Sequence, residues 1–170
     1  ILMCGIQVGS MDDEEIPGAP GVAGMTDADE AAVFRSVLDT SNIAMIVLGQ
    51  EFTVQWVNSQ AEAYFGIARE TFVGSDKATL IESTIKSRFE RPERYAETII
   101  GSFEDNSEIE SFECHLLAGE DRAERWLEHR SKPIESGALA GGRIEQFVDI
   151  SERKQRESEL DATKHRLEMA

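Results

Sequence analysis

The segment from Gly137 to Lys154 constrains the fold of this chain more than any other part of the sequence. A glycine-rich turn leads into Arg143–Ile150, in which apolar and polar residues alternate, and Asp-Ile-Ser-Glu then leads into a long charged helix. Alternation with a period of two predicts a strand that turns one face toward a core. A sheet is therefore joined almost directly to a helix that continues to the end of the sequence.

The charge of the chain argues against polyanionic partners. The formal net charge is -16, from 33 acidic and 17 basic residues, so phosphate backbones and anionic membrane surfaces repel it. We expect no nucleic-acid partner and no direct membrane insertion, since every apolar run is far shorter than the ~18 residues of a spanning helix. The acid excess and the scarcity of lysine suggest a salt-rich cytoplasm, with an acidic mesophilic protein as the alternative.

The sequence carries no recognisable catalytic or metal-binding motif. Cys4 and Cys114 form neither a disulfide framework nor a metal-ligand spacing, which fits a reducing cytoplasm. Nucleophile-elbow, phosphate-loop, kinase and zinc-site motifs are all missing from the sequence. We therefore expect no enzymatic activity from this chain, no catalytic residue and no metal site, although a kinase domain downstream would be compatible with it.

The N-terminal part divides into a lead-in and a helix. Residues 1–25 contain acidic, proline and glycine residues without periodicity, which indicates a disordered lead-in or linker. Residues 26–40 predict an amphipathic helix with Thr26 as its N-cap. Its apolar stripe needs a partner, which is either the sheet of the same domain or the same helix of a second copy. The stripe consists of Val33, Phe34, Val37 and Leu38.

Residues 41–150 predict two strands, several short helices and then three strands. Strands are expected at Ile43–Leu48 and Phe52–Val57, and then at Glu108–Ala118, Arg122–Ile134 and Arg143–Ile150. Helices are expected at Ser59–Phe65, Arg69–Val73, within Lys77–Arg88 and at Pro92–Ile100. Asn58 is placed to cap the first of these helices, and Gly66 and Gly74 are placed to end the first two. This order predicts an α+β domain.

Four local patterns, in this order, resemble PAS domains: Trp56-Val57-Asn58, the helix ending at Gly66, the short helix ending in Val73-Gly74, and Asp149-Ile150-Ser151-Glu152-Arg153-Lys154. The resemblance covers roughly residues 33–154. It implies a PAS fold, a five-stranded antiparallel sheet with short helices over one face and flanking N- and C-terminal helices. It also implies that residues 151–170 form a signalling helix that leads to a further domain.

The resemblance implies a sensor domain of a multidomain cytoplasmic signal-transduction protein of the histidine kinase or chemotaxis-transducer type. Such a domain binds a small ligand or relays a signal from a neighbouring domain. A ligand-free homodimerisation module is the alternative. Haem-binding relatives place a histidine on the helix that corresponds to Pro92–Ile100, and covalent flavin relatives place a cysteine within Ser75–Arg88; neither is present here. The cofactor stays unknown, and non-covalent flavin remains open.

Strand alternation gives a candidate cavity for a ligand. The inward residues expected on the last three strands are Phe112, Cys114, Leu116, Leu127, His129, Gln146 and Val148. His129 and Gln146 are the polar groups that would orient a ligand among apolar neighbours. Two alternatives stay open: these two side chains bond to each other or to the backbone, or the assumed facing of the strands is reversed.

Two further sets of residues are expected to serve signalling and association. Asp149, Ser151 and Glu152 lie at the junction of strand and helix, where Asp149 and Glu152 have the spacing of a capping box. Trp126 is expected on the outer face of the sheet, covered by the helix over residues 26–38. A homodimer contact is therefore expected from Phe34, Val37, Leu38 and Trp126, and adjacent signalling domains of the same chain are the other expected partners.

Overall fold

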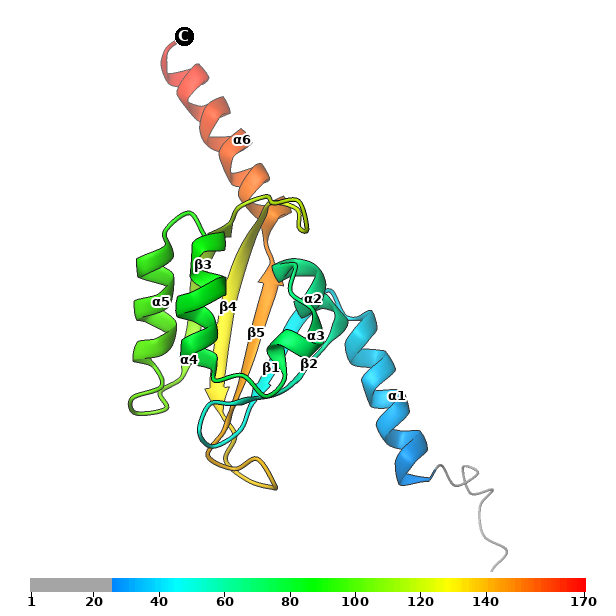
Figure 1. The fold of residues 1–170 in the computed structure, drawn as a ribbon. Coiled ribbons are helices and arrows are strands. Elements are labelled where there is room, and N and C mark those ends of the chain that lie inside the picture. Colours follow the sequence, from blue (N-terminus) through cyan, green and yellow to red (C-terminus); the bar gives the residue numbers. More distant parts are fainter. Residues whose placement is uncertain (1–25) are drawn as a thin grey trace, which may run out of the picture.

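The computed structural model describes residues 26–170, in which five antiparallel strands form one sheet with helices over one of its faces (Figure 1). The expected lead-in over residues 1–25 lies outside the described residues. The strand order is β2-β1-β5-β4-β3. The strands are β1 (Ile43–Leu48), β2 (Val54–Val57), β3 (Ile109–Leu116), β4 (Arg125–Pro133) and β5 (Arg143–Asp149). This arrangement confirms the predicted α+β fold.

Short helical segments connect β2 to β3 and cover the inner face of the sheet, while two longer helices flank the domain (Figure 1). The covering helices are α2 (Ser59–Phe65), α3 (Arg69–Phe72), α4 (Lys77–Leu80), the π-helical turn η1 (Ile81–Ile85), the 3-10 turn η2 (Lys86–Arg88) and α5 (Pro92–Gly101). The flanking helices are α1 (Asp27–Thr40) and α6 (Ser151–Glu168). None of the helices within residues 26–170 is long and apolar enough to cross a membrane.

The core lies between the inner face of the sheet and the covering helices. Phe65 of α2 makes edge-to-face contacts with Phe147 of β5, at 5.0 Å between ring centroids, and with Phe72 of α3, at 6.1 Å. Both contacts are fully buried, so aromatic packing fixes α2 and α3 against the centre of the sheet. The remaining inward residues are mainly branched aliphatic side chains, which include Ile46, Leu48, Ile81, Ile85, Ile99 and Leu116.

Local sequence signals place the helix ends where they were expected. The Thr26 hydroxyl accepts a hydrogen bond from the amide of Asp29, and the Asp29 carboxylate accepts one from the Thr26 amide, which completes a capping box for α1. Gly66 ends α2 with φ of 60°, and Gly74 follows α3 with φ of 86°. A Cβ at Gly66 would lie 2.5 Å from the carboxyl carbon of Asp121, so glycine is required there for close approach as well as for conformation.

The buried amide of Asn58 connects four segments of the chain. Its Oδ1 accepts hydrogen bonds from the amides of Met45 at 2.9 Å and Ala61 at 3.1 Å. Its Nδ2 donates to the carbonyl oxygens of Leu38 at 2.9 Å and Ile43 at 2.8 Å. One side chain therefore caps α2 and holds the end of α1 against β1.

We expect Asn58→Ala to lower the free energy of unfolding by about 3 kcal/mol or more, because it leaves buried backbone donors and acceptors without partners. Urea unfolding followed by circular dichroism measures this loss. Asn42→Ala is the control, because Asn42 is exposed and its side chain makes no hydrogen bond. Equal stability of the two variants would contradict the role assigned to Asn58.

Candidate functional site

The inner faces of β3 and β4 carry the residues that were predicted there. Phe112 pairs with His129 and Cys114 pairs with Leu127 across the two strands, so all four side chains lie on the same face. Cys114, Leu116, Leu127 and His129 are buried, and Phe112 is partly buried. Burial raises the pKa of the Cys114 thiol far above its usual value, which makes this cysteine an inert core residue.

The predicted inner face of β5 is wrong. Gln146 and Val148, together with Ile144, lie on the outer face, and Arg143, Glu145 and Phe147 point toward the core. The register requires this facing, because Phe147 pairs with the inward His129 on one side and the inward Ala44 on the other. His129 and Gln146 therefore lie on opposite faces of the sheet and cannot orient one ligand together.

A buried ion pair explains how Glu145 of β5 can face the core. Lys77 Nζ of α4 lies 2.8 Å from Glu145 Oε2, and both side chains are fully buried. Burial is the largest single influence and would raise the pKa of Glu145, but Lys77, together with smaller contributions from His129 and Arg143, outweighs it, and the pKa stays below its usual value. The pair holds the N-terminus of α4 over the centre of the sheet.

Arg143 is the second charged residue inside the domain. Its guanidinium donates hydrogen bonds to Asn106 Oδ1 at 2.9 Å, to the Ser107 carbonyl oxygen at 2.6 Å and to Ser131 Oγ at 2.6 Å. These three acceptors come from the segment before β3 and from β4. Hydrogen bonds to neutral groups therefore compensate much of its burial, although its Nε has no partner, and Arg143 fastens the segment between α5 and β3 to the sheet.

Several buried polar atoms near this cluster have no hydrogen-bond partner. Both ring nitrogens of His129 and the hydroxyl of Tyr95 on α5 lack one, as does Oε1 of Glu145. Burial lowers the pKa of His129 to about 4, with Glu145 opposing the shift and Lys77 and Arg143 adding to it. His129 is therefore a neutral imidazole near pH 7. Unsatisfied buried groups are rare in folded proteins, so this interior is suited to a polar ligand or ordered water.

Sequence reasoning missed the charged members of this cluster, Lys77, Arg143 and Glu145. Phe147 was the one available signal, because it is the largest apolar residue of β5 and lies on the opposite face from Ile144 and Val148. Placing Phe147 on the inner face would have assigned the two faces of β5 correctly. Nothing in the residues around Lys77 distinguishes it from an exposed lysine, since its burial depends on a partner 68 positions later in the chain.

The base of α6 is attached to β4 and β5 by a compact set of hydrogen bonds. Ser151 Oγ accepts from the Trp126 amide at 3.0 Å and donates to Asp149 Oδ1 at 2.6 Å. The Ile150 amide also donates to the Trp126 carbonyl oxygen. Asp149 Oδ2 lies 3.3 Å from Arg125 Nε. Two of the three predicted relay residues, Asp149 and Ser151, are thus brought together at the junction.

The third predicted relay residue, Glu152, does not belong to this junction. The expected capping box is wrong, because Asp149 accepts from the Ser151 amide at 2.9 Å, and Glu152 pairs with Arg156 along the exposed helix. The predicted spacing assumed a helix that begins after Asp149, but α6 begins after Ile150. Glu152 is therefore the second residue of the helix and not the third, the position from which a capping box closes.

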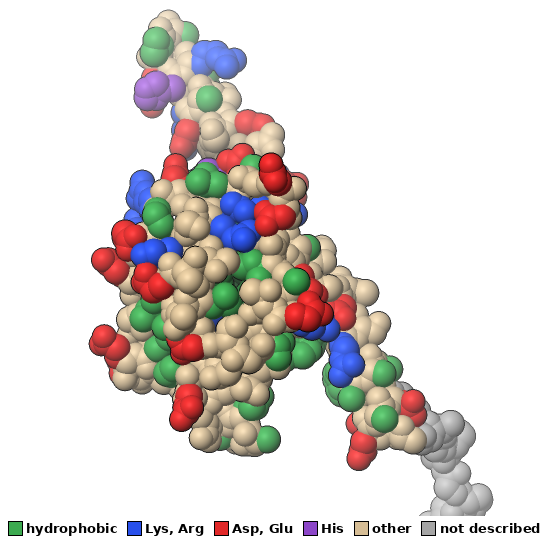
Figure 2. Space-filling model, in the orientation of Figure 1, with side chains coloured by type: hydrophobic (Ala, Val, Ile, Leu, Met, Phe, Trp, Pro, Cys, Tyr) green, Lys and Arg blue, Asp and Glu red, His purple; other side chains and the backbone are tan. Residues whose placement is uncertain are grey.

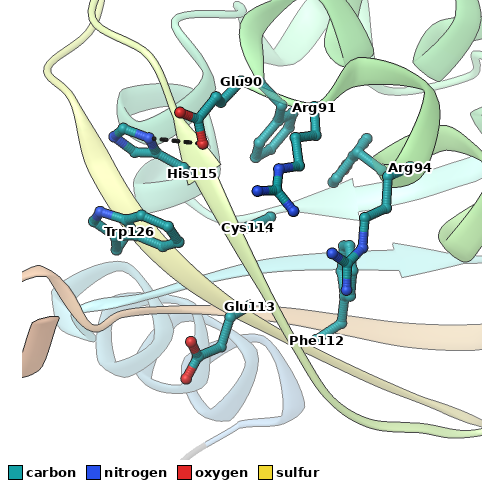
Figure 3. Close-up of a pocket in the computed structure, with 10 residues that line it drawn as sticks. Glu90, Arg91, Arg94, Phe112, Glu113, Cys114, His115 and Trp126 are labelled. Atoms are coloured by element: carbon teal, nitrogen blue, oxygen red, sulfur yellow. Dashed lines mark ion pairs between the residues drawn. The ribbon is translucent and has the colours of Figure 1, made fainter.

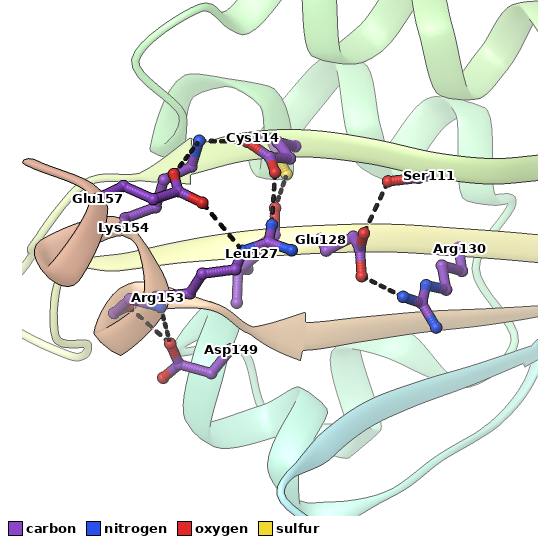
Figure 4. A network of polar contacts seen from close by, with 11 residues as sticks. Ser111, Cys114, Leu127, Glu128, Arg130, Asp149, Arg153, Lys154 and Glu157 are labelled. Atoms are coloured by element: carbon purple, nitrogen blue, oxygen red, sulfur yellow. Dashed lines mark hydrogen bonds and ion pairs between the residues drawn. The ribbon is translucent and has the colours of Figure 1, made fainter. Parts of the chain in front are cut away.

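Further charges bind α6 to the edge strand β3. Glu113 pairs with Arg153 at 2.5 Å and with Lys154, and Glu157 lies close to both basic residues (Figure 4). Lys154 Nζ also lies 5.0 Å from the centre of the Trp126 ring. The first turns of α6 therefore respond to the position of β3 as well as of β4 and β5.

The prediction that α1 covers Trp126 is wrong within one chain, and a contact between two copies stays a prediction. Trp126 lies on the outer face, as expected, but its ring stacks on His115 at 4.5 Å, and Lys154 lies over it. The hydrogen bonds that join α1 to the rest of the domain lie near the end of the helix. They are made by the carbonyl oxygen of Leu38 and the carboxylate of Asp39. Phe34 and Val37 of α1 are exposed, as is Val33, and Leu38 is partly buried (Figure 2). The structure does not bring these residues to Trp126.

A family model described as the PAS fold matches residues 38–155. Among solved structures, the chain is similar to an RNA-binding light-oxygen-voltage receptor, at 16% identity and a TM-score of 0.57. That alignment covers 88% of this chain but only 41% of the receptor. A comparison with curated proteins gave no match.

The chain is also similar to two isolated PAS domains. The PAS domain of an HTR-like protein from Haloarcula marismortui has 14% identity and a TM-score of 0.50, and the alignment covers 72% of this chain and 93% of that domain. The PAS domain of a protein from Colwellia psychrerythraea has 18% identity and a TM-score of 0.49, with coverage of 73% and 99%. At these identities the structural likeness concerns the fold alone.

We expect Lys77→Met to lower the free energy of unfolding by about 3–5 kcal/mol, because it leaves the Glu145 carboxylate buried without its counter-ion. The double variant Lys77→Met/Glu145→Met should recover most of this loss, since no charge is then buried. Urea unfolding at neutral pH measures both. Glu152→Gln, which breaks the exposed pair with Arg156, is the control and should leave stability unchanged. A double variant as unstable as the sum of the single variants would refute the coupling.

Proposed function

Because the chain belongs to the PAS family, whose model matches residues 38–155, we propose that it is a sensor domain that passes a change in its sheet to α6. The observation that carries this proposal is the junction of Asp149, Ser151 and Trp126. There a helix is hydrogen-bonded directly to two strands of the sheet. A small displacement of β4 relative to β5 changes these bonds and therefore the orientation of the helix.

The character of α6 supports an output role. No residue of α6 is buried, and the helix projects from the domain (Figure 1). A helix that is polar on all sides and leaves its own domain after the first turns is typical of connections between domains. We therefore place it before a signalling domain of a larger cytoplasmic protein, of the histidine kinase or chemotaxis-transducer type, and assign this domain no catalytic activity of its own.

A chain of contacts also connects the bases of the two flanking helices. Tyr64 of α2 donates a hydrogen bond at 2.6 Å to the carbonyl oxygen of Asn42, just after α1. The guanidinium of Arg125 lies 4.5 Å from the centre of the Tyr64 ring and pairs with Asp149. A signal that arrives through α1 from a preceding domain can therefore reach α6 through Tyr64 and Arg125.

The buried polar cluster supports a small-molecule input. Tyr95, His129 and Glu145 retain unused hydrogen-bonding capacity inside the domain, between the covering helices and the sheet. Groups of this kind are costly unless a partner satisfies them, so a polar ligand that did so would stabilise one arrangement of the sheet. Such a differential stabilisation is what a ligand-operated sensor requires.

Homodimerisation is the second candidate function, and the exposed stripe on α1 favours it. Val33, Phe34 and Val37 are each at least half exposed, at 50%, 66% and 59%. Figure 2 shows hydrophobic side chains at the surface of α1. Apolar residues gathered on one helix face gain free energy when a second surface covers them. A second copy of this helix offers such a surface. In that case α1 would hold two sensor domains together, and the dimer would carry two α6 helices.

Ser151→Ala tests the relay in the isolated chain. We expect amide hydrogen exchange at Trp126 and in the first turn of α6 to accelerate by about fivefold, because the hydrogen bond lost is worth about 1 kcal/mol. Exchange in β1 should not change. Thr163→Ala is the control, because Thr163 bonds only to Glu159 within the exposed part of α6. In a longer protein that contains an output domain, Asp149→Ala should impair output more than ligand binding.

Unchanged exchange in Ser151→Ala would mean that the junction does not hold the helix, and the relay would then be refuted. Equal losses of output and binding in Asp149→Ala would indicate general damage to the domain. That outcome would also contradict a specific relay.

Phe34→Glu tests the association. We expect it to weaken any homodimer at least about tenfold, because it places a charge in the apolar stripe of α1. Sedimentation equilibrium of the chain measures the change. Ser36→Glu adds the same charge at an exposed position beside the stripe and should leave the equilibrium unchanged. A chain that stays monomeric at high concentration would exclude this second candidate.

A further inference from the structure

A pocket of about 240 Å³ opens between the start of α5 and the edge strand β3 (Figure 3). Arg91 and Arg94 border it on the helix side, and Phe112 and Cys114 border it on the strand side. The pocket is distinct from the ion pair of Lys77 and Glu145 in the core, which contributes no lining residue. It lies instead beside the strand that holds the base of α6.

The free charge of the pocket is positive, although the chain as a whole is strongly acidic. Of its two acidic residues, Glu113 pairs with Arg153 and Lys154, whereas Glu90 has only His115 nearby, at 3.5 Å from Nδ1. The two arginines therefore outnumber the one carboxylate that has no lysine or arginine partner. No carboxylate within residues 26–170 lies at ion-pair distance from Arg91 or Arg94. Both guanidiniums extend toward the strand side of the pocket (Figure 3). They are therefore available to an anion from solution.

The other walls of the pocket are apolar and aromatic. Phe112 is partly buried, with Arg94 at 5.8 Å from its ring centre, and Tyr95 stacks on Phe89 at 3.9 Å between centroids. Tyr95 is only 1% exposed, and its hydroxyl has no hydrogen-bond partner in the described chain. An apolar body would thus find aromatic contacts, while the Tyr95 hydroxyl belongs to the buried polar cluster described above.

We propose that this pocket binds a small organic carboxylate with an aromatic or short apolar body. Arginine guanidiniums match the planar, bidentate geometry of a carboxylate, and the aromatic walls favour a ligand with an apolar part over a bare inorganic anion. The volume of the pocket is that of roughly eight water molecules, which corresponds to a compound with a single ring. This proposal deepens the sensor function proposed above and rests on it.

The position of the pocket connects its occupant to the output helix. Glu113 and Trp126 line the pocket and also contact Lys154 of α6. A ligand beside Glu113 restricts the movement of this side chain and brings a second negative charge close to it. The carboxylate of Glu113 is then held toward Arg153 and Lys154, away from the ligand. Occupancy therefore strengthens the attachment of α6 to β3.

Titration of the purified chain with sodium benzoate, followed by amide NMR and calorimetry, tests the site. We expect saturable binding with a dissociation constant below about 10 mM and shifts at Arg91, Arg94, Cys114 and the Trp126 indole. Benzamide, which has the same ring without the charge, and inorganic phosphate, which has the charge without the ring, should each bind at least about tenfold more weakly. Bound benzoate should also slow hydrogen exchange in the first turn of α6.

The double variant Arg91→Gln/Arg94→Gln should bind benzoate at least about tenfold more weakly than the unaltered chain. Both side chains are exposed, so its circular dichroism and thermal unfolding should not change. Arg35→Gln, which removes an exposed arginine of α1, is the control for net charge and should bind normally.

The proposal is overturned if benzoate does not bind, if benzamide binds equally well, or if the double variant binds as tightly as the unaltered chain. These outcomes leave the relay through Asp149 and Ser151 intact, because its test in the Ser151→Ala variant needs no ligand. Conversely, if Ser151→Ala leaves hydrogen exchange unchanged while benzoate still binds, the sensor function is refuted but the binding site is confirmed.

Discussion

The buried ion pair between Lys77 and Glu145 is the interaction on which the arrangement of the domain depends. Both side chains are fully buried with 2.8 Å between their charged atoms, and neither could remain charged in the core without the other. The pair requires that β5 turn Glu145 inward, which also places Phe147 against Phe65 and Arg143 against Ser131. The same pair fixes α4, and through it the covering helices, over the middle of the sheet.

The two flanking helices are attached at one end of the sheet, on neighbouring strands. Ile43 at the start of β1 pairs with Val148 near the end of β5, so α1 enters the sheet close to where α6 leaves it. Tyr64 and Arg125 bridge the two positions. The pocket beside α5 contacts the same region from β3 through Glu113 and from β4 through Trp126. Inputs from a ligand, from a preceding domain or from a second copy therefore converge on the base of α6.

Local patterns predicted most of the fold but only part of the candidate site. The expected strands, the cap at Asn58 and the helix end at Gly66 were confirmed, because each depends on residues close together in the sequence. The inner faces of β3 and β4 followed from simple alternation. Alternation predicted the wrong inner face for β5, because the inner face of this strand carries a charged residue whose partner lies on α4. The unpaired arginines at the pocket were equally hidden, since only the fold shows which carboxylates lie out of their reach.

The sequence by itself determined the order of the elements, the PAS fold and the direct connection of the last strand to α6. These properties follow from hydrophobic periodicity, turn residues and caps, which act over a few residues. Only the tertiary structure decided which face of β5 is buried, what covers Trp126 and where free positive charge remains. Those outcomes depend on strand register and on ion pairs between distant segments, such as Lys77 with Glu145 and Glu113 with Lys154. Short-range patterns carry no information about such contacts.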